Sequence, residues 1–185
     1  DVGTRISYGS MHLHDQGWET HISRYWRPDL IRTRLEEIDF IMPQEEDAQS
    51  RFKISYFMTP GKDRLNKVHH VLTRNRFKYT LIYSQNKNLD ILPYRASKGK
   101  AIRYISYKWG IPLNNILVCG DSGNDAEMLR GEPLGVVVGN YSPELEELKP
   151  LKKIYFSEET HAGGILDGIR HYKYIERLRN IKHGK

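Results

Sequence analysis

The sequence lacks the features that mark disulfide-rich secreted proteins and membrane-spanning proteins. Its 185 residues include a single cysteine, Cys119, which cannot form an intramolecular disulfide and is compatible with a reducing compartment. No apolar run approaches the ~20 residues that a transmembrane helix needs. We therefore expect a cytoplasmic protein with no membrane partner.

A dense basic run is also missing. The formal net charge is +6, but lysine and arginine are spread along the chain, which argues against nucleic acid as the partner. An anionic small-molecule substrate accounts for the charge more simply. The composition, 38% hydrophobic and 28% charged, is typical of a globular protein, and the length suits one ordinary domain or two small ones.

The most informative stretch is Cys-Gly-Asp-Ser-Gly-Asn-Asp at 119–125. An apolar strand at 116–119 is predicted to enter it, and a short helix at 126–130 to leave it. In open α/β sheets, ligands bind at the carboxyl ends of buried strands. Two carboxylates there suit Mg²⁺, which is usually held by a few carboxylates and a phosphate. The alternative interpretation is an ordinary turn rich in Asp, Gly and Asn.

The second half of the chain alternates helices with apolar strands. Residues 134–138 are wholly apolar, as in a parallel strand that is covered on both faces. The other predicted elements are a helix at 98–109, a helix that starts at 142–143, a strand at 154–156 and one final helix from 161 onward. This alternation predicts half of a doubly wound α/β domain.

The first half has a different pattern. A short strand is predicted over residues 1–9. Further along, helices are predicted from residue 28 and over 63–75, with strands at 52–58, 79–83 and 89–93. These elements predict a small sheet with helices on one face.

These motifs resemble those of haloacid dehalogenase superfamily phosphatases. Ser97-Lys98-Gly99-Lys100-Ala101 is similar to the third motif of that superfamily, and 120–125 to its fourth. The closer resemblance is to the sucrose-phosphate phosphatase family and to the phosphatase-like C-terminal domain of sucrose-phosphate synthases. That resemblance is carried by segments along the whole chain, at 2–6, 53–56, 90–93, 117–125 and 161–166.

The resemblance implies a partial doubly wound, Rossmann-like haloacid dehalogenase core with an inserted α+β cap. Residues 1–9 would form a core strand, 10–92 the substrate-specificity cap and 93–185 the rest of the core. The first motif of the family, which carries the nucleophilic aspartate, has no counterpart here. Asp1 is rejected for that role because no apolar strand precedes it and no second aspartate follows. We expect that roughly 60–70 residues of the family's layout lie outside this chain.

The resemblance also implies roles for the motif residues. Lys98, Asp121 and Asp125 would be catalytic, with Lys98 placing an ammonium charge on the phosphate. Asp121 and Asp125 would be the Mg²⁺ ligands, although Asp125 is open to a second interpretation as the group that orients Lys98. Ser122 and Asn124 would hydrogen-bond the phosphate or the waters of the metal.

Four cap residues are predicted to bind the sugar: Ser55, Tyr56, Asn86 and Asp90. Sugar hydroxyls are bound by hydroxyl, amide and carboxylate groups beside an aromatic ring, and these residues lie at strand ends or loops of the cap. His161 lies at the start of a predicted helix. Whether it caps that helix or contacts a ligand is open.

The predicted function is Mg²⁺-dependent hydrolysis of sucrose 6-phosphate to sucrose and phosphate. The parent protein would be a separate phosphatase or a bifunctional sucrose-phosphate synthase with a covalently linked glycosyltransferase domain. Two alternatives remain open. One is a non-catalytic regulatory domain of such a glycosyltransferase, and the other is a phosphatase for another sugar phosphate.

Overall fold

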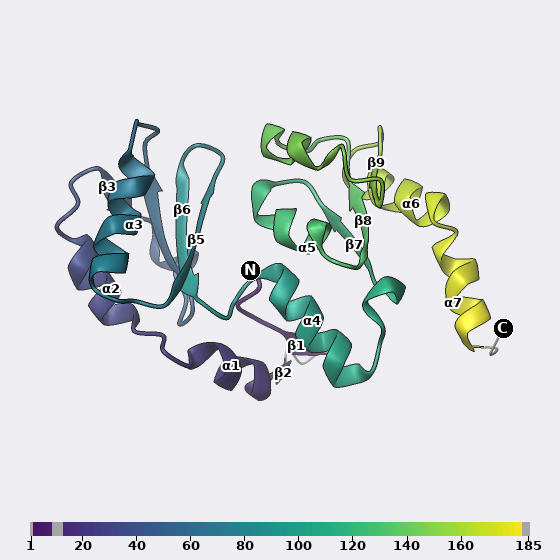
Figure 1. Cartoon of the computed structure of the whole chain (residues 1–185), viewed down its shortest axis with the longest axis horizontal. Helices are drawn as coiled ribbons and strands as arrows, with labels where there is room; N and C mark the ends of the chain where they lie inside the picture. Colours follow the sequence, from purple (N-terminus) through teal and green to yellow (C-terminus); the bar gives the residue numbers. More distant parts are fainter. Residues whose placement is uncertain (1, 9–12, 183–185) are drawn as a thin grey trace. The chain divides into compact units, whose positions relative to one another are not determined.

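The computed structural model describes residues 2–8 and 13–182, and it contains two compact units, Asp1–Ser97 and Lys98–Lys185. Each unit is described by itself (Figure 1). The predicted boundary between residues 9 and 10 lies outside the described residues. The predicted division into a core strand, a cap and a core concerns function, and it stays a prediction.

The first unit contains a four-stranded antiparallel sheet with the strand order β3-β4-β6-β5. Its strands are β3 (Ile41–Pro43), β4 (Ile54–Met58), β5 (Tyr79–Ser84) and β6 (Asn88–Pro93). The three strands predicted from alternating β-formers are all present. β3 was missed because a three-residue strand that ends in proline carries almost no local signal.

Two helices, α2 (Pro28–Leu35) and α3 (Arg64–Arg74), cover one face of this sheet. Successive strand residues point to opposite faces, so that Ile54, Tyr56 and Met58 of β4 pack in the helix-covered core. Residues 55 and 57 consequently belong to the other face, which is the more polar one.

The N-terminal segment differs from its prediction. The strand expected over residues 1–9 is reduced, within the described residues, to β1 (Ser7–Tyr8), which pairs antiparallel with β2 (Leu13–His14) in a separate two-stranded sheet. Gly3 has a φ of +87°, and this left-handed conformation interrupts an extended chain. The next helix, α1 (Gln16–Ser23), was not predicted because its residues are mostly polar.

The second unit contains the predicted parallel sheet, in the order β7-β8-β9. The strands are β7 (Leu117–Gly120), β8 (Leu134–Val137) and β9 (Ile154–Phe156). The central strand is the wholly apolar one, and Val136 and Val137 are fully buried. The helices α4 (Lys98–Trp109), α5 (Ala126–Arg130) and α6 (His161–His171) follow the predicted alternation.

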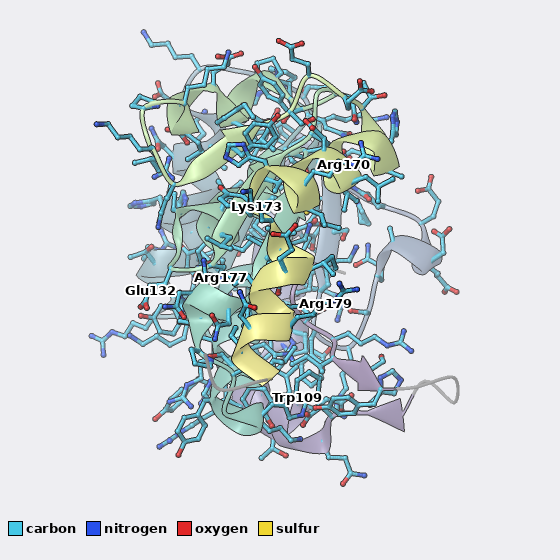
Figure 2. All side chains as sticks on the ribbon, turned by 90° about the vertical axis from the view of Figure 1, so that its right-hand side faces the viewer. Trp109, Glu132, Arg170, Lys173, Arg177 and Arg179 are labelled. Atoms are coloured by element: carbon cyan, nitrogen blue, oxygen red, sulfur yellow. The ribbon has the colours of Figure 1, made fainter. Side chains whose placement is uncertain are left out.

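Two elements of this unit differ from the predictions. The helix expected from Ser142 is a 3₁₀ helix, η4 (Pro143–Leu148). The single final helix is in fact two, α6 and α7 (Tyr174–Lys182), because Lys173 adopts a φ of +47° between them. Figure 2 shows Lys173 near this junction, with Arg177 and Arg179 on α7.

Within the described part of the chain, none of the helices has the length and apolar character needed to span a bilayer.

Close packing of α6 on β8 yields the first prediction. A Cβ atom at Gly168 would collide with the side chain of Val136, whereas one at Gly163 would meet only ordinary contacts at 3.5 Å. We expect Gly168→Ala to lower the free energy of unfolding by about 1–3 kcal/mol through overpacking. Gly163→Ala should leave it unchanged or raise it by about 0.5–1 kcal/mol, because alanine favours the helix.

Urea denaturation followed by circular dichroism measures both effects. Hydrogen exchange over residues 134–171 locates them. Equal stability of the two variants would show that α6 does not pack on β8 this closely.

Candidate active site

The loop after β7 forms a compact turn at the carboxyl end of the parallel sheet. Residues Gly123–Asp125 make a 3₁₀ turn, η3, that leads into α5. A Cβ atom on Gly120 would lie 2.5 Å from the Cβ of Asp125. Glycine is therefore required at 120, because the Asp125 side chain folds back across the end of the strand.

Asp125 is buried and is held by several groups. Its Oδ2 accepts hydrogen bonds from the backbone N–H groups of Asp121 at 3.1 Å and Ser122 at 3.3 Å. Its Oδ1 accepts from Nζ of Lys98 at 2.5 Å, an ion pair in which the Asp125 side chain is 4% exposed. Of the two interpretations left open for Asp125, this geometry favours the one in which it orients Lys98.

Lys98 is the first residue of α4. A cation at the start of a helix is opposed by the helix dipole, and the two acceptors on the motif loop compensate for this. Besides Asp125, Nζ of Lys98 donates to Oδ1 of Asn124 at 2.7 Å, and the hydroxyl of Ser122 donates to the same oxygen at 3.2 Å. The Lys98 side chain remains 28% exposed, so the ammonium is fixed in position without being sealed from a ligand.

A cavity of about 280 Å³ opens beside this ion pair. It is lined by residues from the start of α4, the end of β7 and the turn after it, the segment after β8, and the first turns of α6: Lys98, Cys119, Gly120, Asp121, Asp125, Val138, Asn140, His161 and Ile165. Burial raises the pKa of the Cys119 thiol, which disfavours the reactive thiolate. The chemistry of the cavity therefore depends on its charged and amide groups.

Asp121 differs from Asp125 in its surroundings. It is exposed, and no side chain in residues 2–8 or 13–182 is recorded as a partner of its carboxylate. The described residues contain no cluster of three or more His, Cys, Asp or Glu side chains able to hold a metal ion. The cavity thus offers one free carboxylate and one that is occupied by the protein.

Two residues that support the site, Glu144 and Asn140, were not among the predicted site residues. Oε2 of Glu144 accepts hydrogen bonds from the Gly123 backbone N–H and from the Ser142 hydroxyl, both at 3.0 Å. Oδ1 of Asn140 accepts from the His161 backbone N–H at 2.7 Å. Ser142 and Glu144 were interpreted only as a helix start, and nothing local indicates that Glu144 reaches Gly123, which is 21 residues away.

The predicted sugar-binding residues do not all lie together in the first unit. Ser55 and Asp90 are cross-strand partners on β4 and β6, and the Ser55 hydroxyl donates to Oδ1 of Asp90 at 2.6 Å. Asn86 lies in the turn between β5 and β6 with a φ of +51°. The structure therefore brings Ser55 and Asp90 together, and places Asn86 at the tip of the hairpin.

The prediction that Tyr56 binds the sugar together with Ser55, Asn86 and Asp90 is wrong. Tyr56 lies on the helix-covered face, is 6% exposed, and belongs to the core. Burial raises the pKa of its phenol. Because adjacent residues of a strand point to opposite faces, Tyr56 cannot share a binding face with Ser55.

The chain is similar to several known proteins. The family model for sucrose-6F-phosphate phosphohydrolase matches residues 1–173. Probable sucrose-phosphatase 2 of Arabidopsis thaliana is 34% identical over 93% of this chain and 43% of its own length. Mannosylfructose-phosphate phosphatase of Agrobacterium fabrum is 32% identical over 92% of this chain and 70% of its own length.

A solved structure is also similar. The sucrose-phosphatase of Synechocystis, in complex with sucrose and phosphate, superposes with a TM-score of 0.85 at 29% identity, over 93% of this chain and 72% of that one. The predicted α/β fold class and the predicted family are confirmed. The chain spans less than half of the plant sucrose-phosphatase, at 43% of its length.

The different surroundings of the two aspartates yield the second prediction. Asp125→Asn should lower the free energy of unfolding by about 2 kcal/mol, because it removes the charge that holds Lys98 and weakens the bonds to the loop backbone. Asp121→Asn should change stability by less than about 0.5 kcal/mol, since its carboxylate is exposed. Thermal and urea unfolding of the two variants check this, and an equal loss in both would refute the distinction.

Proposed function

Because the chain belongs to the sucrose-6F-phosphate phosphohydrolase family, we propose that the protein hydrolyses sucrose 6-phosphate to sucrose and phosphate with Mg²⁺. The observation that carries this proposal is the fixed Lys98 ammonium beside the free Asp121 carboxylate in one cavity. The similarity to a sucrose-phosphatase structure that contains sucrose and phosphate supports the substrate class.

Lys98 acts on the phosphoryl group. Negative charge collects on the phosphoryl oxygens as the ester is cleaved, and a pre-positioned cation stabilises that charge without reorganising. Asp125 and Asn124 hold the ammonium at 2.5 Å and 2.7 Å from their oxygens, so the cation is in place before the substrate arrives. Ser122 supports Asn124 through their hydrogen bond.

Asp121 is the residue that would bind Mg²⁺. This ion is commonly held by one or two carboxylates, with phosphate oxygens and waters completing its octahedral shell. A free, exposed carboxylate on the wall of the cavity fits such a site. When bound, Mg²⁺ supplies positive charge to the phosphate oxygens. Asp125 is engaged by Lys98 and the loop backbone, so any contribution from it to the metal would pass through water.

The attacking carboxylate that the family resemblance implies is assigned to no residue of this chain. Asp90 and Asn86 remain our candidates for sugar recognition. Ser55 is fully buried and its hydroxyl is bonded within the protein, so its role would be to orient the Asp90 carboxylate. Tyr56 does not belong to that group, because it is part of the core.

A second candidate substrate has its own support. The mannosylfructose-phosphate phosphatase is matched over 70% of its length. The second candidate substrate is therefore a phosphorylated fructose disaccharide other than sucrose 6-phosphate. The catalytic unit would treat both substrates alike, and the polar face of the first unit would discriminate between them.

The protein context is also part of the proposal. A covalently linked glycosyltransferase domain would make the parent a bifunctional sucrose-phosphate synthase. A purely regulatory role is less well supported, since Lys98, Asp121, Asn124 and Asp125 keep an arrangement suited to phosphate. We place the protein in the cytoplasm, where a lone cysteine stays reduced.

The third prediction concerns the chain by itself. The 185-residue chain should release no phosphate from sucrose 6-phosphate, because it lacks an assigned nucleophile. The full-length protein should do so with Mg²⁺. A phosphate-release assay measures both, and turnover by the short chain near typical enzyme rates of about 10 s⁻¹ would require a nucleophile within it.

The fourth prediction separates Lys98 from Asp121 in the full-length protein. Lys98→Ala should lower the rate by about 10²–10³ while leaving Mg²⁺ binding nearly intact. Asp121→Asn should lower the rate and raise the Mg²⁺ concentration required. Titration with Mg²⁺, by calorimetry and in the assay, distinguishes the two, and full activity of Lys98→Ala would reject the site.

Asp90→Ala serves as the specificity variant in the same assay. It should reduce turnover of sucrose 6-phosphate and spare a small aryl phosphate, because it alters only the sugar-binding face. Equal losses on both substrates would count against a role of the first unit in sugar recognition.

A further inference from the structure

His161 has a side chain in the cavity and a backbone in an unfavourable conformation. It is the first residue of α6, it lines the same cavity as Lys98 and Asp121, and its φ is +50°. Residues with a side chain adopt this left-handed conformation at some cost, and glycine adopts it freely. Histidine is among the residues that tolerate this conformation best, so the turn accommodates the ring at position 161 but does not demand it.

The backbone of His161 is held in place by the other side of the cavity. Its N–H donates to Oδ1 of Asn140 at 2.7 Å, and Asn140 follows β8 and lines the cavity too. The preceding residue, Thr160, makes no side-chain bond that would cap the helix. The hydrogen bond to Asn140 fixes the backbone position of His161 at the carboxyl edge of the sheet.

The imidazole itself is exposed, and no hydrogen bond to it is recorded from the described residues. It thus brings hydrogen-bonding ring nitrogens to a cavity that is also lined by Lys98. Residues held in strained backbone conformations are often found at ligand-binding positions. A capping role for the side chain, the other alternative considered for His161, has no such contact to support it.

We propose that the His161 ring is a substrate contact that hydrogen-bonds the phosphate ester end of the substrate, with Asn140 as its positioning residue. The proposal rests on the proposed function, because it takes the cavity as the phosphate site. The contact is assigned to the phosphate end because Lys98 and Asp121, the groups that act there, share this cavity. His161 should therefore contact every phosphate ester, unlike Asp90 and Asn86, which should contact only the sugar.

Three substitutions of His161 in the full-length protein distinguish the effect of losing the ring contact from the effect of changing the backbone conformation. His161→Gly removes the ring and relieves the strain, His161→Ala removes the ring and keeps the strain, and His161→Asn keeps a polar group in a residue that tolerates this φ. Removing one hydrogen bond to a charged ligand should lower kcat/KM about ten-fold. We expect that loss in both His161→Gly and His161→Ala, on sucrose 6-phosphate and on a small aryl phosphate alike, with partial recovery in His161→Asn.

Lys173→Gly is the matched control. It relieves a left-handed conformation of similar φ, +47°, beyond the other end of α6, and it should leave kcat/KM unchanged. Unaltered kcat/KM in His161→Gly, with a loss only in His161→Ala, would overturn the proposal in favour of a backbone role. A loss confined to sucrose 6-phosphate would also overturn it, since the ring would then contact the sugar.

A binding measurement keeps the proposal separate from the proposed function. The imidazole resonance of His161, identified by its absence from the His161→Gly spectrum, should shift when inorganic phosphate and Mg²⁺ are added to the full-length protein. A shift in a protein that hydrolyses neither substrate would support the phosphate contact while rejecting the proposed function. No shift in a protein that does hydrolyse them would overturn the contact alone.

Discussion

The ion pair between Lys98 and Asp125 is the interaction on which the site depends. At 2.5 Å it joins the first residue of α4 to the turn that follows β7. The same carboxylate organises the turn through the N–H groups of Asp121 and Ser122, and it can do so only because Gly120 has no side chain. One buried charge thus sets the position of the ammonium and the shape of the loop that carries Asp121.

This arrangement gives different surroundings to two carboxylates that are four residues apart. Asp125 is buried and satisfied by protein groups, whereas Asp121 is exposed on the cavity wall. A carboxylate that is hydrogen-bonded by protein groups is suited to positioning a neighbouring side chain, whereas a free carboxylate is suited to binding an external cation. Glu144 adds a second brace through the Gly123 N–H, so the loop is held from both α4 and η4 before any ligand binds.

Much of the fold could be predicted because its signals are local. The wholly apolar run of β8 indicates a buried parallel strand, and α4 begins and ends where its sequence pattern predicts. The break between α6 and α7 could not be predicted, because Lys173 carries no glycine or proline signal for its positive φ. The antiparallel pairing of β1 with β2 was likewise not predicted, because two-residue strands carry almost no local sequence signal.

The site was predictable to the extent that its residues lie in two short motifs, at 97–101 and 120–125. Lys98, Asn124 and Asp125 do come together, but the long-range brace from Glu144 has no sequence signature. The misplaced Tyr56 was avoidable, since the two-residue period of a strand already separates it from Ser55. The preferred orientation of Asp125 towards Lys98 required the actual geometry, because a carboxylate in this motif suits either role.

The most direct test of this account is a double-mutant cycle between Lys98 and Asp125 in the full-length protein, measured as kcat/KM for phosphate release. If Asp125 acts by holding Lys98, then Asp125→Asn should be costly in the wild-type background and nearly neutral once Lys98→Met is present. Strictly additive losses would contradict the account, because they would mean that the two residues contribute to the reaction independently.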